Sequence, residues 1–152
     1  MTKNRRGEQR TVFWLPLSFT PDGIMIETFQ GSRGVSGEIR TFESAVGMPV
    51  ANFLRTEVEN EAKRLGYKYV YIRRAEASAW YQRPVAYDEV KKSARGRELT
   101  ETRGENERNR AELGALEEQA KDKIRSRMKK MIDGVAESGD YMEWMDVFRK
   151  TL

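Results

Sequence analysis

The amino-acid sequence predicts an α+β protein, in which an N-terminal antiparallel β-sheet or small OB-like barrel with one packed helix is followed by a charged linker and C-terminal helices. Three observations lead to this prediction. Short alternating apolar runs recur in the first half, helical apolar spacing marks residues 49–66, and the chain becomes too polar to form an apolar stripe from about residue 88. Alternation with a period of two indicates strands, and a period of 3.6 indicates helices.

Three strand candidates precede the first helix. Residues 11–19 suit an edge strand or a bulged strand, because Pro16 cannot donate a hydrogen bond to a ladder. The turn sequence Thr-Pro-Asp-Gly at residues 20–23 joins this strand to a second one at residues 24–29. Residues 35–42 form a third, weaker candidate.

One helix and two further strands are expected next. Pro49 suits the first turn of a helix whose apolar spacing runs to Leu65, and Gly66 suits the position just after its end. Residues 67–74 then form a tyrosine-rich strand, and residues 75–87 form a last short strand. This order of elements is that of an OB-fold, and a simple antiparallel sheet with one packed helix fits it equally.

Composition divides the chain into four segments. These are a basic flexible arm at residues 1–10, a β-rich domain at 11–87, a charged linker or solvated helix at 88–112, and C-terminal helices at 113–152. The third segment has too few apolar residues to offset the entropy lost on ordering. Asp140 and Glu143 are spaced as a capping box that would start a final helix.

The apolar stripes of the C-terminal helices must dock on something, because short isolated helices are marginal in water. We expect them to drive self-association into a homo-oligomer. The residues assigned to this role are Leu113, Leu116, Ile124, Met128, Met131, Tyr141, Trp144, Met145 and Phe148.

The candidate functional residues centre on the tyrosine-rich strand. Alternation places Tyr67, Tyr69 and Tyr71 on one face with Arg73, and leaves Val70 to the core on the other face. Aromatic rings beside positive charge are typical of surfaces that bind single-stranded nucleic acid, where each stacked base contributes about 1–3 kcal/mol. Tyrosines are also common in strands and at subunit interfaces, so an interface is the alternative interpretation.

Charge adds further candidates to this row. Residues 1–86 hold 13 Lys and Arg against 9 Asp and Glu, whereas residues 87–152 hold 15 of each, so the net charge of +4 belongs to the half that carries the tyrosines. The residues expected to bind nucleic acid are Tyr67, Tyr69, Tyr71, Arg73, Arg74, Lys68, Arg40, Arg33, Arg5, Arg6, Arg10, Trp14 and Trp80.

A basic run at residues 121–130 has two interpretations. Its cations suit a helix that contacts phosphates, and they equally suit the solvated flank of an amphipathic helix whose charges pair with nearby Glu and Asp. The second interpretation is favoured, because Glu117, Glu118 and Asp122 lie close in the sequence.

Several classes of protein are disfavoured by what the chain lacks. It contains no cysteine and no histidine, which excludes thiolate chemistry and removes the usual proton shuttle and the commonest transition-metal ligand. No apolar run approaches the ~18 residues of a membrane-spanning helix. We therefore expect a cytoplasmic protein that is not an enzyme, uses no cofactor or metal, and does not enter a membrane.

In overall style the chain resembles small replication-accessory and single-stranded DNA-binding proteins of bacteriophages, being cysteine-free and charge-rich with a β-domain and a helical tail. The resemblance implies a protein that coats single-stranded DNA during replication. The residues favour the same function, namely sequence-independent binding of single-stranded nucleic acid, with DNA favoured, by an oligomer. The alternative is an oligomeric structural or adaptor protein, such as a virion component or an inhibitor of a host protein, that uses the tyrosine face as an interface.

Overall fold

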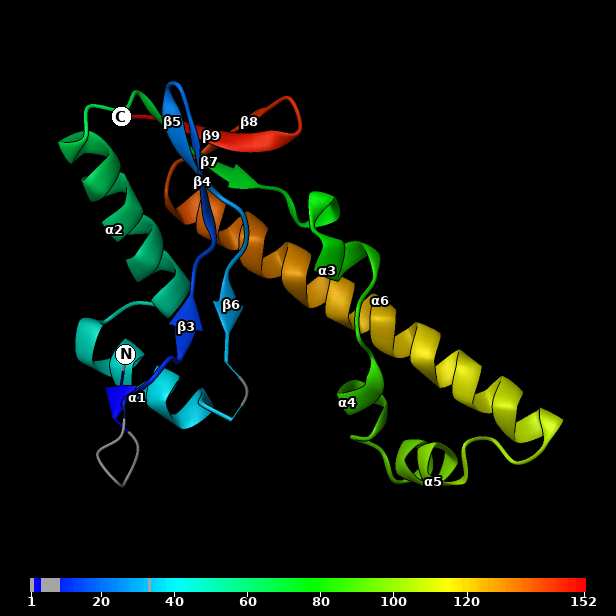
Figure 1. Ribbon diagram of the computed structural model, residues 1–152. Helices are drawn as coiled ribbons and strands as arrows, with labels where there is room; N and C mark the ends of the chain where they lie inside the picture. The colour runs from blue at the N-terminus through cyan, green and yellow to red at the C-terminus, as the bar shows by residue number, and fades with distance from the viewer. Residues whose placement is uncertain (1, 4–8, 33) are drawn as a thin grey trace. The chain divides into compact units, whose positions relative to one another are not determined.

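The computed structural model describes residues 2–3, 9–32 and 34–152 of the chain, which separates into two compact units (Figure 1). The first unit comprises Met1–Arg74 and Ile132–Leu152, and the second comprises Ala75–Met131. The first unit is thus discontinuous in sequence, and its limits differ from the segment boundaries that composition suggests.

A mixed five-stranded sheet forms the first unit, with the strand order β4-β5-β7-β9-β8. Its strands are β4 (Leu17–Thr20), β5 (Gly23–Ile26), β7 (Tyr69–Arg73), β8 (Met142–Trp144) and β9 (Val147–Thr151). The pair β5 and β7 is parallel, and all other neighbours are antiparallel. The expectation of a purely antiparallel sheet was therefore wrong. Nor is the OB-like barrel confirmed, because β4 and β8 are the two edges of an open sheet.

Two short ladders accompany this sheet. β1 (Thr2–Lys3) pairs with β2 (Gln9–Arg10), and β3 (Phe13–Trp14) pairs with β6 (Gln30–Gly31). The strand expected over residues 11–19 is divided at Pro16, whose carbonyl oxygen accepts a hydrogen bond of 2.9 Å from the N–H of Glu27. The proline interrupts the strand because it has no N–H of its own.

The helices α1 (Ser36–Val46) and α2 (Val50–Arg64) lie between β6 and β7 in the chain. The strand expected at residues 35–42 was wrong, because α1 occupies it and packs Phe42 edge-to-face on Phe53 of α2 with ring centroids 5.1 Å apart. The helix expected over residues 49–65 is confirmed. It ends with Gly66 at φ +80°, where the next N–H groups return to Lys63 and Ala62 in a Schellman arrangement.

The core of the first unit lies between the sheet and α2, which contacts both β5 and β7. Parallel pairing sets Ile24 beside Val70 and Ile26 beside Ile72, and all four side chains are at most 2% exposed. These branched side chains suit a strand whose one face is buried. The parallel strands β5 and β7 and the helix α2 between them in the chain therefore form the core of the first unit.

A buried polar network joins α2 to the last turns of α6 (Glu107–Ser138). Arg55 is 8% exposed and donates to the carbonyl oxygen of Val135 at 2.8 Å and to the hydroxyl of Ser138 at 2.9 Å. Glu59 is 6% exposed and pairs with Arg55 at 3.5 Å and with Lys150 of β9 at 3.1 Å. Arg55 thus donates to Val135, one of the last carbonyl groups of α6, which have no partner within the helix.

The final helix expected from residue 140 was wrong, because this segment forms the β8–β9 hairpin. Asp140 adopts φ +62° directly after α6, so the chain leaves the helical conformation there. β9 then pairs with β7 along its whole length, from Arg73 opposite Val147 to Tyr69 opposite Thr151. The hydrogen bonds of this ladder pair the backbone N–H and C=O groups of β9 with those of β7. An isolated helix over the same residues would be marginal in water.

The second unit consists of short helical segments and most of α6. These segments are η1 (Ala75–Ala77), α3 (Ala79–Gln82), α4 (Tyr87–Val90) and α5 (Ala94–Thr102). The strand expected at residues 75–87 was therefore wrong. Within residues 88–112 the structure shows packed helix as well as connecting chain, since Leu99 of α5 is fully buried.

Three of the residues assigned to self-association pack inside the second unit. Ala86, Val90 and Ala120 form a small buried cluster. Against it pack Leu113, Leu116 and Ile124. Much of the apolar stripe of α6 thus has a partner within the same chain.

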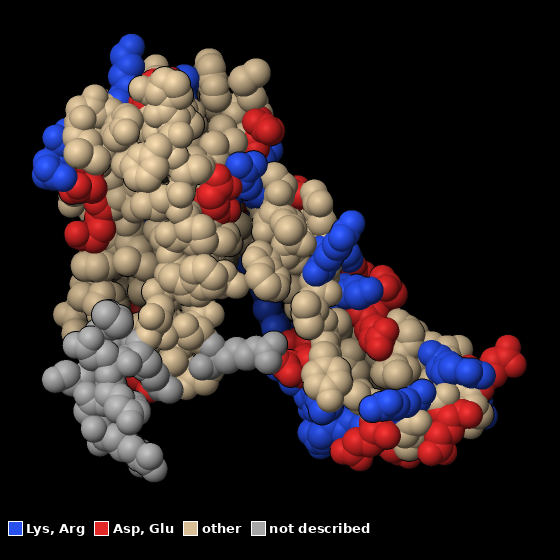
Figure 2. Space-filling view, viewed as in Figure 1, with Lys and Arg blue, Asp and Glu red and all other residues tan. Residues whose placement is uncertain are grey.

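The basic run of α6 is also largely engaged within the second unit. Arg127 and Lys123 both pair with Glu89 of α4, at 2.9 and 3.3 Å. Arg125 donates to the carbonyl oxygen of Tyr81 at 2.9 Å. Figure 2 shows Lys and Arg interspersed with Asp and Glu over this unit. These contacts agree with the interpretation of the run as a charge-paired helix flank.

No helix among the described residues is both long and apolar enough to cross a membrane.

Truncation of a buried side chain of β7 should destabilise the protein. We expect Ile72→Ala to lower the free energy of unfolding by about 2–5 kcal/mol and Ile72→Val by about 0.5–1.5 kcal/mol, because Ile72 is 1% exposed. Urea unfolding followed by circular dichroism measures both. Val85→Ala, at a residue 61% exposed, is the matched control and should change the free energy little. An equal effect of Ile72→Ala and the control would contradict this description of the core.

The second unit should be sensitive to acid through Glu89. Hydrogen bonds from Arg127, Lys92 and Lys123 lower the pKa of Glu89 to about 2 from an ordinary 4.5. Because the folded-state pKa is the lower one, this stabilisation is present above pH 4.5 and is lost as the pH falls toward 2. We expect the difference in unfolding free energy between the wild type and Glu89→Gln to shrink over that range. Glu101→Gln, an exposed carboxylate of α5, should show no such change.

Candidate nucleic-acid interface

The two faces of β7 differ in chemistry as the alternation predicts. Val70 and Ile72 are buried toward α2, whereas Tyr69, Tyr71 and Arg73 are partly exposed on the opposite side. Because α2 contacts β5 and β7 from the Val70 side, we name the other side the open face. The open face is defined by Tyr69, Tyr71, Arg73, Trp144 and Arg149.

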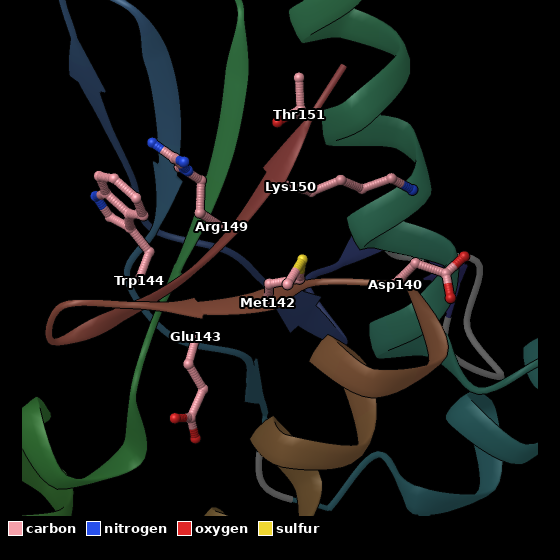
Figure 3. A pocket seen from close by; sticks show the side chains of 7 residues that line it. All are labelled: Asp140, Met142, Glu143, Trp144, Arg149, Lys150 and Thr151. Carbon is pink, nitrogen blue, oxygen red and sulfur yellow. The ribbon is translucent and has the colours of Figure 1, made fainter.

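The C-terminal hairpin brings Arg149 and Trp144 to this face. Arg149 of β9 is the register partner of Tyr71, so both side chains emerge on the same side. Its guanidinium carbon lies 3.4 Å from the ring centroid of Trp144 and 4.4 Å from that of Tyr69. Figure 3 shows Trp144 and Arg149 on one side of the hairpin and Lys150 pointing the other way, toward α2. Cation–π contacts at partly exposed sites contribute about 0.5–1 kcal/mol each.

The aromatic rings form a continuous group. The rings of Tyr69 and Tyr71 lie 5.9 Å apart at 45°. Tyr71 packs over Gly23, where an added Cβ would lie 2.8 Å from its Cε2 atom. The same Cβ would lie 2.5 Å from the backbone oxygen of Tyr69, so the close approach of β7 to β5 requires glycine at position 23.

A carboxylate fixes the far end of Tyr71. Its hydroxyl donates to Asp22 Oδ1 at 3.0 Å, and Asp22 also accepts from Thr20 at 2.9 Å in the β4–β5 turn. Burial and this acidic partner raise the pKa of Tyr71 above its ordinary value. The phenol therefore stays neutral. Asp22 binds its hydroxyl, and its ring packs over Gly23.

The two arginines of the open face have different partners. Arg73 pairs through two nitrogens with Glu27, and one of these contacts, from Nη2 to Oε1, measures 3.3 Å. The hydrogen bond from Arg73 lowers the pKa of Glu27. Arg149, among the described residues, forms no ion pair with a carboxylate and contacts aromatic rings instead. Its charge is therefore the more available one on this face.

A pocket of about 450 Å³ adjoins the open face at the β8 edge of the sheet (Figure 3). It opens where β8 begins at Met142 while β9 runs on to Thr151. Trp144 and Arg149 line the pocket together with Asp140, Met142 and Thr151. Pockets of this size hold small ligands.

The structure brings together only part of the set that the sequence suggested. Tyr69, Tyr71 and Arg73 share the open face, but Tyr67 precedes β7 and its ring lies 6.4 Å from that of Phe19. Lys68 also precedes the strand and is exposed. Two of the three tyrosines in the expected row therefore lie in β7, and Tyr67 lies outside the strand.

Three other candidates lie elsewhere in the first unit. Arg74 pairs with Glu143 at 3.2 Å and stacks on Phe148, away from the tyrosines. Arg40 is exposed on α1 and donates to a carbonyl oxygen of its own helix. Trp14 is half-exposed on β3.

The remaining candidates cannot be grouped with the open face. Trp80 is half-exposed at the start of α3 in the second unit. Arg5, Arg6 and Arg33 lie outside the described residues, and of Arg10 only the backbone, in β2, is described.

Trp144 and Arg149 were not recognised as candidates for this face from the sequence. Trp144 was assigned to self-association on a helix, and Arg149 was assigned no role. The alternation of residues 147–151 is the one signal that would have found Arg149, and a helical interpretation of the same residues concealed it.

The other residues assigned to self-association have varied surroundings. Tyr141 is buried, and burial followed by the charge of Glu59 raises its pKa. Met145 is 86% exposed at the tip of the hairpin. Met128 and Met131 are partly buried on α6.

Within the described part of the chain, no group of three or more Asp and Glu side chains is placed to hold a metal ion. In the comparisons with known proteins, no family model, no curated protein and no solved structure matches the chain.

The pKa of Tyr71 should respond to Asp22. We expect Asp22→Asn to lower the pKa of Tyr71, because removing the negative charge makes the phenolate easier to form. Ultraviolet difference titration of the phenolate band, assigned with Tyr71→Phe, measures the shift. Glu57→Gln, an exposed carboxylate on α2, should leave the titration unchanged. A Tyr71 titration that is identical in wild type and Asp22→Asn would contradict the assigned contact.

Proposed function

We propose that this protein binds single-stranded nucleic acid, with DNA favoured, on the open face and without catalysis. The observation that carries the proposal is the gathering of Tyr69 and Trp144 around the guanidinium of Arg149, with Tyr71 beside Tyr69 on the same sheet face. Bases stack on aromatic faces and phosphates pair with cations in such surfaces. Sheets of RNA-recognition modules use strand aromatics in the same physical way.

The same chemistry favours binding that is independent of sequence. Ring faces accept every base, because every base has a π-face. The carboxylates beside the rings are already engaged, Asp22 with Tyr71 and Glu27 with Arg73, so they offer little readout of base edges. Binding should therefore depend on stacking more than on hydrogen bonds to bases.

Electrostatics limits the strength of one such site. Arg73 is neutralised by Glu27, which leaves Arg149 as the main cation for phosphate on this face. Each phosphate contact on a single strand adds about 0.7 to the slope of log affinity against log salt. One site should thus bind modestly, and several sites in an oligomer would bind one strand more tightly.

A second candidate function is assembly, as an oligomeric structural or adaptor protein. Phe19 is 64% exposed beside Leu17 on the edge strand β4. Figure 2 shows few charged side chains on the viewed face of the first unit. An edge strand with exposed apolar side chains is a surface on which another chain can pair. This observation favours an interface at β4 and leaves the open face to a ligand.

Loss of the tyrosine rings should weaken binding of nucleic acid. We expect Tyr69→Ala and Tyr71→Ala each to weaken binding of fluorescein-labelled oligo-dT by about 5- to 150-fold, which corresponds to 1–3 kcal/mol per stacked base. Fluorescence anisotropy measures the affinity. Tyr87→Ala removes an exposed tyrosine of the second unit and is the matched control.

The same variants distinguish the two functions. Light scattering should show an unchanged molecular mass for Tyr69→Ala, and Phe19→Glu tests the edge strand separately. Absence of oligo-dT binding at micromolar protein would exclude the first function. Loss of assembly in Tyr69→Ala, without any effect on nucleic acid, would support an interface at the tyrosines instead.

A further inference from the structure

The space between Tyr69 and Trp144 is filled by a side chain of the protein itself. In the sheet, Trp144 on β8, Arg149 on β9 and Tyr69 on β7 follow one another diagonally across neighbouring strands. The guanidinium of Arg149 lies 3.4 Å from one ring centroid and 4.4 Å from the other. The guanidinium therefore lies over both rings, and we call the space that it occupies between Tyr69 and Trp144 the slot.

A nucleobase matches the occupant of this slot in shape. The guanidinium group and a base are both planar, and both stack on aromatic faces. Stacking of a base on a ring is the stronger of the two contacts, because a cation–π contact at a partly exposed site is weakened by water. Exchange of the guanidinium for a base is therefore favourable, provided that Arg149 finds another partner.

The adjoining pocket supplies room for the displaced side chain. Arg149 and Trp144 both line this pocket of about 450 Å³ (Figure 3). The pocket is also lined by Asp140, Lys150 and Glu143, and Glu143 already pairs with Arg74. Arg149 has no carboxylate partner among the described residues in its present position, so its charge can meet a phosphate at the mouth of the pocket. A phosphate attached to the stacked nucleotide would lie close to the slot by covalent connection.

We propose that a nucleobase replaces the Arg149 guanidinium between Tyr69 and Trp144, and that Arg149 turns into the adjoining pocket and binds a phosphate of the same strand. This inference rests on the proposed function and specifies its ligand, which is an unpaired base together with its phosphate. A duplex presents its phosphates but keeps its bases stacked on one another. The slot thus selects single strands, while Arg149 closes it in the absence of ligand.

Fluorescence of Trp144 reports the occupant of the slot. Of the three tryptophans in the chain, Trp14 and Trp80 are both 49% exposed and can be replaced by Phe, which leaves Trp144 as the sole tryptophan for selective excitation. The probes are oligo-dT and an abasic oligonucleotide of equal length. We expect oligo-dT to quench Trp144 and the abasic strand to bind without quenching. Oligo-dT that binds in a salt-dependent manner without quenching Trp144 would overturn the slot while leaving the proposed function intact.

Variants of Arg149 test its second role. We expect Arg149→Ala to keep the quenching by oligo-dT while the salt slope of binding falls by about 0.7, the value of one phosphate contact on a single strand. Arg149→Lys should retain the slope, because it retains the charge. Arg64→Ala removes a cation from the exposed surface of α2 and should alter neither the quenching nor the slope.

Each of the following results would contradict a specific part of the proposal. An unchanged salt slope in Arg149→Ala, or loss of quenching in that variant, overturns the exchange of Arg149 for a base. Quenching by the abasic strand overturns the assignment of a base to the slot. Failure of the wild-type protein to bind oligo-dT at any salt concentration overturns both this inference and the proposed function, and is thereby distinguished from the other results.

Discussion

The burial of Val70 and Ile72 beneath α2 is the constraint on which the rest of the first unit depends. A strand presents successive side chains to opposite faces, so this burial obliges Tyr69 and Tyr71 to face the other way. The parallel pairing with β5 on one side and the antiparallel pairing with β9 on the other then set the neighbours of the tyrosines. The open face is thus a consequence of how the core is packed.

Positive charge serves different purposes in the two units. In the second unit Lys123 and Arg127 of α6, together with Lys92, pair with Glu89 and so join α4 to the long helix. In the first unit Arg55 is buried and satisfies the end of α6, while Arg149 stacks on aromatic rings at the surface. Arg149 is thus distinguished from Arg73, the other arginine of the open face, by its aromatic partners and not by the local density of charge.

The second unit shows how a polar segment can become ordered. Its small cluster of Ala86, Val90 and Ala120 contributes little buried area, yet partly buried residues of α6 extend it. Ion pairs add to this where they are shielded from water, as at Glu89, whose side chain is 9% exposed. Composition alone suggested a charged linker or a solvated helix at residues 88–112, because composition does not count the apolar residues that α6 brings to this cluster.

Local sequence was enough to predict the turn at residues 20–23, the helix α2 with its glycine stop, and the division of β7 into a buried and an exposed face. Each depends on neighbouring residues and on a period that one element shows alone. Only the tertiary structure decided that residues 142–151 form strands, because their apolar spacing also fits a helix and their turn has Met145, at φ +55°, where Gly or Asn is usual. That choice depended on the free edge of β7, which is distant in sequence, and it is what placed Trp144 and Arg149 beside the predicted tyrosines.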